Sequence, residues 1–248
     1  MISETTATTI LEHARAAAPA ECCGLIVKKG DDHVYWPARN VAADPVSHFE
    51  IDADDWIDAE NAGEVIALVH SHPNGPRHLT SLDRINQVKT GLDWLLAVDN
   101  TVLHFPPVPH LLHREFEHGV TDCYTLFRDA YALCGVEMDD FHRPDDWWKG
   151  ELDLYVDNIE SQDFERIDGE PQIGDVILIQ LQSNKANHAA IYLGNQQILH
   201  HLPKRLSGRD LYSGYWLKHT HSVWRMKAWQ PSDFTAIFDD LATNSSLT

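Results

Sequence analysis

The chain has 248 residues, and its 19 basic side chains stand against 38 acidic ones for a net charge of -19. With 43% hydrophobic and 23% charged residues, this is the composition of a soluble globular protein that can hold one large domain or two small ones. Such acidity argues against general binding to nucleic acids and to anionic membrane surfaces, because both depend on basic side chains.

The sequence has neither the basic, apolar start of a signal peptide nor a run of about 18 apolar residues that would span a membrane. We therefore expect the protein to be made and folded in a reducing cytoplasm. Its four cysteines, Cys22, Cys23, Cys123 and Cys134, form no CxxC pair, and two of them are adjacent. This spacing argues against a disulfide framework.

Residues 1–105 alternate between helix-type and strand-type segments. Apolar side chains that recur every three or four residues indicate helices, and short apolar runs between turn-forming residues indicate buried strands. Ser3, Asp52 and Thr80 are side chains that favour helix starts. The predicted helices are 3–18, 52–62 and one from about 80, and the predicted strands are 22–27, 33–36, 65–69 and 94–98.

A proline-rich segment separates the two halves. Residues 105–109 (FPPVP) cannot continue a helix or a central strand, because proline lacks the backbone donor and fixes its own torsion angle. We therefore predict an α+β protein of two domains. The predicted divisions are a first domain at 1–105, a linker at 106–111, a second domain at 112–232 and a polar C-terminal tail at 233–248.

The second half predicts one helix followed by a group of strands. The helix over 122–133 is closed by Gly135, and acidic, tryptophan-rich sequence that is helical or irregular continues to about residue 165. The next strand-type runs are 175–181, 188–193 and 197–201, with a turn at 195–196 between the last two.

A predicted buried strand of the first half ends in a histidine pair. His70 and His72 are two residues apart, which places both imidazoles on one side of an extended strand end. Asp83 lies in the first turn of the next predicted helix, and Glu21 precedes the first strand. Since imidazole and carboxylate are zinc ligands, these residues form a candidate Zn²⁺ site with Glu21 as general base. The simpler alternative is that Thr80 and Asp83 only cap a helix and that the histidines lie in a loop.

These residues resemble the signature of the JAMM (MPN-type) metallopeptidase family. That signature combines a glutamate, a His-Ser/Thr-His-Pro motif and a Ser-x-x-Asp motif at a fixed interval. The chain has Glu21, residues 70–73 (HSHP) and residues 80–83 (TSLD) at that interval. The resemblance covers 1–105 and implies an MPN-like α/β sheet domain.

The resemblance also implies a role for each residue of the set. His70, His72 and Asp83 are the implied zinc ligands, and Glu21 is the implied acid/base. Thr80 stands where the family usually has a serine that supports the tetrahedral intermediate. Because threonine keeps the hydroxyl but adds a methyl group, we expect metal binding to survive better than catalysis.

The second half holds a cysteine and a histidine in the settings of a nucleophile and its base. Cys123 lies in the first turn of a predicted helix, where the dipole and free N–H groups lower a thiol pKa and bind an oxyanion. His188 begins a strand, and His200 is a candidate to orient its ring, opposite His188 if the turn is tight. Alternatively, Cys123 is a small buried hydrophobic residue and both histidines are strand-edge residues. Cys134, late in the helix, is expected to be structural.

The surrounding sequence resembles the NlpC-type cysteine peptidases, which cut peptidoglycan stem peptides. The matching stretches are 122–123, 174–176, 188–194 and 198–200. The resemblance implies a papain-like α+β domain in which Cys123 is the nucleophile, His188 the base and His200 the third polar residue. Tyr124 and Thr125 replace the Ser-Gly that commonly follows the cysteine, which is expected to reshape the pocket beside it.

The order of the two domains resembles the K family of tail assembly proteins in lambda-like phages, as do residues 114–123 and 208–216. This resemblance implies a virion component at the tail tip, assembled with other tail-tip proteins in the host cytoplasm and acting at the host cell wall. We expect an endopeptidase that opens peptidoglycan stem peptides, by resemblance between D-glutamate and diaminopimelate. The zinc domain would be a maturation peptidase or a docking module.

Two other functions stay open at this point. The protein is alternatively a structural tail-tip assembly factor with vestigial hydrolase sites. It is otherwise a cellular isopeptidase driven by the zinc domain alone, although the second domain argues against that.

Overall fold

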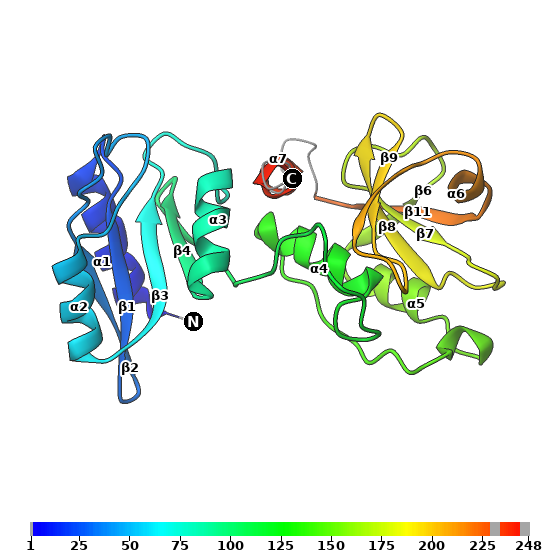
Figure 1. The fold of residues 1–248 in the computed structure, drawn as a ribbon, viewed down its shortest axis with the longest axis horizontal. Helices are drawn as coiled ribbons and strands as arrows, with labels where there is room; N and C mark the ends of the chain where they lie inside the picture. The colour runs from blue at the N-terminus through cyan, green and yellow to red at the C-terminus, as the bar shows by residue number, and fades with distance from the viewer. Residues whose placement is uncertain (1, 229–233, 244–248) are drawn as a thin grey trace. The chain divides into compact units, whose positions relative to one another are not determined.

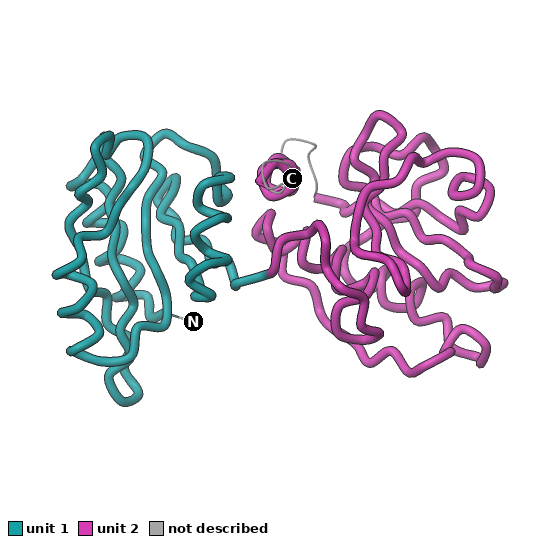
Figure 2. The backbone as a smooth tube through the Cα atoms, viewed as in Figure 1, with its two compact units in different colours: residues 1–108 teal, residues 109–248 magenta. Residues whose placement is uncertain are grey.

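The computed structural model describes residues 2–228 and 234–243, and the chain divides into two compact units, 1–108 and 109–248 (Figure 2). Both units combine helices with a β-sheet, so the predicted two-domain α+β class is confirmed. Among the described residues, no helix is both long and apolar enough to cross a membrane.

The first unit is built on a five-stranded sheet in the order β2-β1-β3-β4-β5 (Figure 1). Its strands pair antiparallel except for the parallel pair β3–β4. The elements are α1 (Glu4–Ala17), β1 (Cys23–Lys29), β2 (Asp32–Ala38), α2 (Ala53–Ala62), β3 (Glu64–Ser71), α3 (Ser81–Thr90), β4 (Asp93–Val98) and β5 (Thr101–Phe105).

Helices α1 and α2 cover opposite faces of this sheet. Ile10 of α1 packs with Ile26 and Leu95 on one face, while Ala59 of α2 packs with Leu25 on the other. Every element predicted for this half is present, and β5 is an additional strand. It returns from β4 through Asp99 and Asn100, both with positive φ, as in a tight hairpin turn.

The second unit is built on a six-stranded antiparallel sheet in the order β10-β9-β8-β7-β11-β6, against which α4 packs (Figure 1). Its elements are α4 (Cys123–Leu133), a 3₁₀ turn (Trp147–Lys149), α5 (Leu154–Ser161), β6 (Phe164–Ile167), β7 (Val176–Ile179), β8 (His188–Gly194), β9 (Gln197–His200), β10 (Gly208–Leu211), α6 (Tyr215–Lys218), β11 (Thr220–Met226) and α7 (Thr235–Thr243).

Three strands of this sheet were absent from the sequence prediction. β6 and β10 lie at the two edges of the sheet, and their sequences FERI and GRDL are largely polar because each presents side chains to solvent. β11 completes the sheet between β7 and β6. The turn predicted at Asn195 and Gln196 is confirmed, since both residues have positive φ between β8 and β9.

The C-terminal segment differs from the polar tail expected at 233–248. α7 buries Ile237 and Leu241, which are four residues apart and share one helix face, and it packs against α4. The buried Asp240 accepts hydrogen bonds from the Leu111 N–H at 2.8 Å and from His110 Nδ1 at 2.9 Å. Because polar residues lie between these apolar ones, the composition of the segment did not indicate a helix with an apolar face. Residues 244–248 lie outside the described part of the chain.

Candidate functional site

A cluster of metal-binding side chains lies at the end of β3. His70, His72 and Asp83 are all buried, and their ligand atoms lie within 4.8 Å of one another. The two histidine Nε2 atoms are 3.1 Å apart, and Asp83 Oδ2 is 3.6 Å from Nε2 of His70 and 3.4 Å from Nε2 of His72. Three donor atoms thus converge on one point.

The environment of the two imidazoles suits a metal site. His72 Nδ1 lies 2.8 Å from the carbonyl oxygen of Pro76, to which it donates a hydrogen bond, so its Nε2 lone pair faces the cluster. Phe49 stacks on the His70 ring at 4.8 Å. Burial lowers the pKa of His70, which keeps this imidazole neutral. Burial opposes it, but Asp83 and the Pro76 carbonyl raise the pKa of His72. Two imidazoles and one carboxylate make up a zinc-type ligand set.

Asp83 serves the helix and the cluster at the same time. Thr80 is the N-cap of α3, and its N–H and hydroxyl both donate to Asp83 Oδ2, at 2.8 and 2.7 Å. That oxygen is the one that faces the two histidines. Although burial opposes it, the imidazoles and the Thr80 hydroxyl hold the pKa of Asp83 well below its usual value. The capping and the metal-binding interpretations therefore describe the same arrangement.

Glu21 is buried beside this cluster, just before β1. The adjacent Cys22 N–H donates to Ser71 Oγ at 2.8 Å, which fixes the start of β1 against the histidine motif. Burial raises the pKa of Glu21 to about 7, against the opposing effect of His72. A carboxyl group with a pKa near neutrality is suited to taking and returning a proton.

A second site occupies a cleft of about 900 Å³ in the second unit. Cys123 is the first residue of α4, with Asp122 as the N-cap, and His188 is the first residue of β8. Both line this cleft. The remaining wall is rich in aromatic side chains, namely Phe116, Trp147, Trp148, Tyr155, Tyr215 and Trp216.

The thiol of Cys123 contacts a residue that the sequence did not single out. Its Sγ lies 3.0 Å from the hydroxyl of Tyr155 and also interacts with the backbone N–H of Ala189. We expected a lowered thiol pKa, but burial and the neighbouring Asp122 raise the pKa of Cys123 to about 11. Burial outweighs the effect of the helix N-terminus, so in the free protein the thiol is protonated at neutral pH.

His188 and His200 are hydrogen bonded. His188 Nε2 lies 3.0 Å from His200 Nδ1, and His200 Nε2 lies 3.0 Å from Asp210 Oδ2 on β10. A tight turn predicted His200 directly opposite His188. In the structure His200 pairs with Ala190 across the β8–β9 ladder, so it lies diagonal to His188. Trp216 packs edge-on against the His200 ring at 4.7 Å. Asp210, which lies on the edge strand β10, was not among the predicted site residues.

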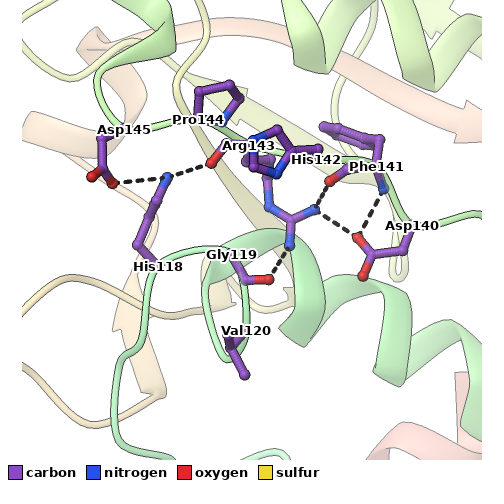
Figure 3. A pocket seen from close by; sticks show the side chains of 9 residues that line it. All are labelled: His118, Gly119, Val120, Asp140, Phe141, His142, Arg143, Pro144 and Asp145. Carbon is purple, nitrogen blue, oxygen red and sulfur yellow. Dashed lines mark hydrogen bonds and ion pairs between the residues drawn. The ribbon is translucent and has the colours of Figure 1, made fainter.

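The loop before Cys123 is held by a buried arginine (Figure 3). The Arg143 guanidinium donates to Asp122 Oδ2 at 2.8 Å, to Asp140 Oδ1 at 2.7 Å and to the Gly119 carbonyl at 3.2 Å. Its side chain is 0% exposed and that of Asp122 is 2% exposed. The N-cap that positions Cys123 therefore depends on a buried ion pair.

Replacing Arg143 with methionine is expected to lower the free energy of unfolding by about 3–5 kcal/mol, because it leaves Asp122 buried and unpaired. Urea unfolding of the full chain measures this change. Arg128→Met is the matched control, since Arg128 is partly exposed and its pairs with Asp129 and Asp140 contribute about 0–1 kcal/mol. Equal losses in the two variants would contradict the anchoring role.

Comparison with known proteins assigns both units. Residues 3–104 match the prokaryotic homologs of the JAB domain, and residues 113–225 match the NlpC/P60 family. The folds and the two clusters thus define a two-domain protein that joins a JAB-type domain to an NlpC/P60 domain. Tail tip assembly protein K of Escherichia phage lambda is 50% identical over 194 residues, which cover 78% of this chain and 98% of that protein. The chain therefore belongs to the tail tip assembly protein K family.

Two further relatives agree with this assignment. Tail tip assembly protein K of Escherichia phage N15 is 35% identical over 226 residues, covering 88% of this chain and 93% of that protein. Desampylase of Haloferax volcanii is 33% identical over 101 residues, covering 36% of this chain and 73% of that protein.

Proposed function

We propose that the second unit is a cysteine endopeptidase that hydrolyses amide bonds in peptidoglycan stem peptides. The observation that carries this proposal is the shared cleft, in which Cys123 at a helix N-terminus and His188 at a strand start lie together, with His200 behind the base. The NlpC/P60 match supports the peptide substrate class.

In this reaction Cys123 Sγ bonds to the amide carbonyl carbon while His188 takes the thiol proton. The free backbone N–H groups at the start of α4 stabilise the resulting oxyanion. His188 then returns the proton to the leaving amine, which breaks the C–N bond and leaves a thioester. His188 then takes a proton from water, whose oxygen bonds to the thioester carbonyl carbon. The C–S bond breaks, the acid leaves, and His188 returns the proton to the Cys123 sulfur. Because the thiol has a pKa of about 11 and His188 is neutral, proton transfer accompanies attack and does not precede it.

We also propose that the first unit binds Zn²⁺ through His70, His72 and Asp83. A bound zinc ion supplies a Lewis acid and an activated water molecule. Glu21, with its pKa near 7, then takes and returns the proton, and Thr80 holds Asp83 in place. The match of residues 3–104 to the prokaryotic homologs of the JAB domain supports metallopeptidase chemistry in this unit, which we place in tail assembly.

We place both activities at the tip of a phage tail, assembled with other tail proteins in the host cytoplasm and acting on the host cell wall. The names of the two phage relatives support this location. The test is incubation of the full chain with Gram-negative peptidoglycan, with soluble fragments identified by mass spectrometry. We expect stem-peptide fragments in the presence and in the absence of a chelator, since the cysteine cleft lies entirely within residues 109–248.

The rate of this hydrolysis is expected to depend on pH through His188. Burial, together with neighbouring His200 and His201, lowers the pKa of His188 well below its usual value. A base is active only when neutral, so the acidic limb of kcat/KM shifts downward and has its midpoint below pH 6.5. A pH–rate profile on a soluble stem peptide measures this limb, and a midpoint above pH 6.5 would contradict the described environment.

A further inference from the structure

The histidine pair of the cysteine site continues into a third residue, Asp210, to which the sequence analysis assigned no role. Asp210 accepts from His200 Nε2 at 3.0 Å, and its side chain is 24% exposed, so it is largely withdrawn from water. Arg205 lies 3.2 Å from the same carboxylate oxygen. Asp210 is held by the pairing of β10 with β9, where it lies across from Ile198.

The protonation of each group follows from this chain of contacts. Burial opposes it, but hydrogen bonds from Arg205 and His200 lower the pKa of Asp210, so the carboxylate is ionised and can only accept. His200 Nε2 must then be the donor. Burial lowers the pKa of His200, so its ring is neutral and Nδ1 carries a lone pair.

The same reasoning extends to the base. His200 Nδ1 accepts, so the partner atom at 3.0 Å, His188 Nε2, must donate. The His188 ring is also neutral, since its pKa is lowered by burial and by His200 and His201. Its remaining nitrogen, Nδ1, therefore carries the lone pair that a general base needs.

We propose that Asp210 is a positioning residue that acts through His200 to keep His188 in the tautomer whose Nδ1 accepts the Cys123 proton. Asp210 touches neither the thiol nor the substrate cleft. It fixes His200, and His200 fixes His188. Trp216 packs against both rings, at 4.7 Å from His200 and 6.1 Å from His188, and covers the hydrogen bond between them. A carboxylate behind an imidazole commonly sets the tautomer in this way.

The first test reads the tautomers directly and does not depend on hydrolysis. In ¹⁵N-labelled full chain at pH 7.5, with His188→Gln and His200→Gln used for assignment, both rings should carry the proton on Nε2. In Asp210→Asn the His200 ring should lose this single tautomer. A wild-type His200 protonated on Nδ1, or unchanged signals in Asp210→Asn, would overturn the proposal.

The second test measures the thiol. Alkylation of Cys123 by iodoacetamide, followed by mass spectrometry from pH 5 to 10, should slow about 10- to 100-fold at neutral pH in Asp210→Asn. Asp168→Asn removes an equal charge from an exposed site in the same unit and should alkylate like the wild type. Equal rates in Asp210→Asn and the wild type would overturn the proposal.

The role of Asp210 in catalysis rests on the proposed endopeptidase function, but these readouts separate the two. If wild-type protein releases no stem peptides while the tautomer and alkylation changes occur, the positioning role stands and the proposed function fails. If hydrolysis occurs at the wild-type rate in Asp210→Asn, with an unchanged acidic limb of its pH profile, the positioning role fails and the function stands.

Discussion

Replacing Cys123 with alanine is expected to reduce the release of stem-peptide fragments by at least about 10⁴-fold, the scale on which a covalent nucleophile contributes to catalysis. The substitution removes the atom that forms the acyl-enzyme and leaves His188, His200 and the start of α4 in place. Mass spectrometry of soluble fragments after incubation with purified peptidoglycan measures the loss.

Cys134→Ala is the matched control, because it deletes a thiol from the other end of the same helix. Cys134 is the C-cap of α4, and its Sγ donates to the Ala130 carbonyl at 3.5 Å. This variant should release fragments at the wild-type rate. Release by Cys123→Ala at that rate would exclude this cleft as the source, and no release by any form would favour the assembly role with vestigial sites.

The histidine motif of the first unit shows which features of a site can be predicted from local sequence. The spacing of His70 and His72 and the start of α3 at Thr80 are local properties, and strand and helix geometry then determine which way these side chains point. The sequence predicted the set correctly as a group that lies together. It did not predict that one oxygen of Asp83 both caps the helix and faces the histidines, since that depends on the packing of α3 beside β3.

The cysteine site was less predictable because its partners come from distant elements. Tyr155 follows Cys123 by 32 residues, on the short helix α5, and only the tertiary fold brings its hydroxyl to the thiol. Asp210 lies on a short polar edge strand without the apolar alternation that marks a buried one. Neither contact leaves a periodic signal in the sequence.

The pKa of the Cys123 thiol shows a different limit of prediction from sequence. The helix N-terminus was visible in the sequence and favours thiolate, but the burial that opposes it depends on how α4 and β8 pack together. Local motifs thus predict Cys123 as the candidate nucleophile, whereas its protonation state is a property of the folded unit.

The residues of each candidate site lie within one unit. His70, His72, Asp83 and Glu21 all lie within residues 1–108, and Cys123, His188 and His200 all lie within 109–248. We therefore expect the two sites to be lost independently by mutation, which allows each to be tested in the full chain.

Asp83→Asn is expected to reduce bound zinc from about one ion per chain to background, because it removes the only anionic ligand of the His70, His72 and Asp83 cluster. The asparagine oxygen can still accept the Thr80 N–H that Asp83 Oδ2 accepts at 2.8 Å, so α3 keeps its N-cap. Metal analysis of dialysed protein measures the content. In the wild type, zinc at about 100 times its Kd should also raise the free energy of unfolding by about 2.7 kcal/mol, an increase that this variant should lack.

Asp99→Asn is the control for the loss of one carboxylate near the same sheet. Asp99 is 67% exposed and forms an ion pair with Arg77 at 3.0 Å, so the Asp99→Asn variant should bind zinc like the wild type. Peptidoglycan hydrolysis should be equal in both variants, because the cysteine cleft is formed by the other unit. Zinc retained at the wild-type level by Asp83→Asn would show that the buried cluster is not the metal site, and it would return Asp83 to the role of a helix cap.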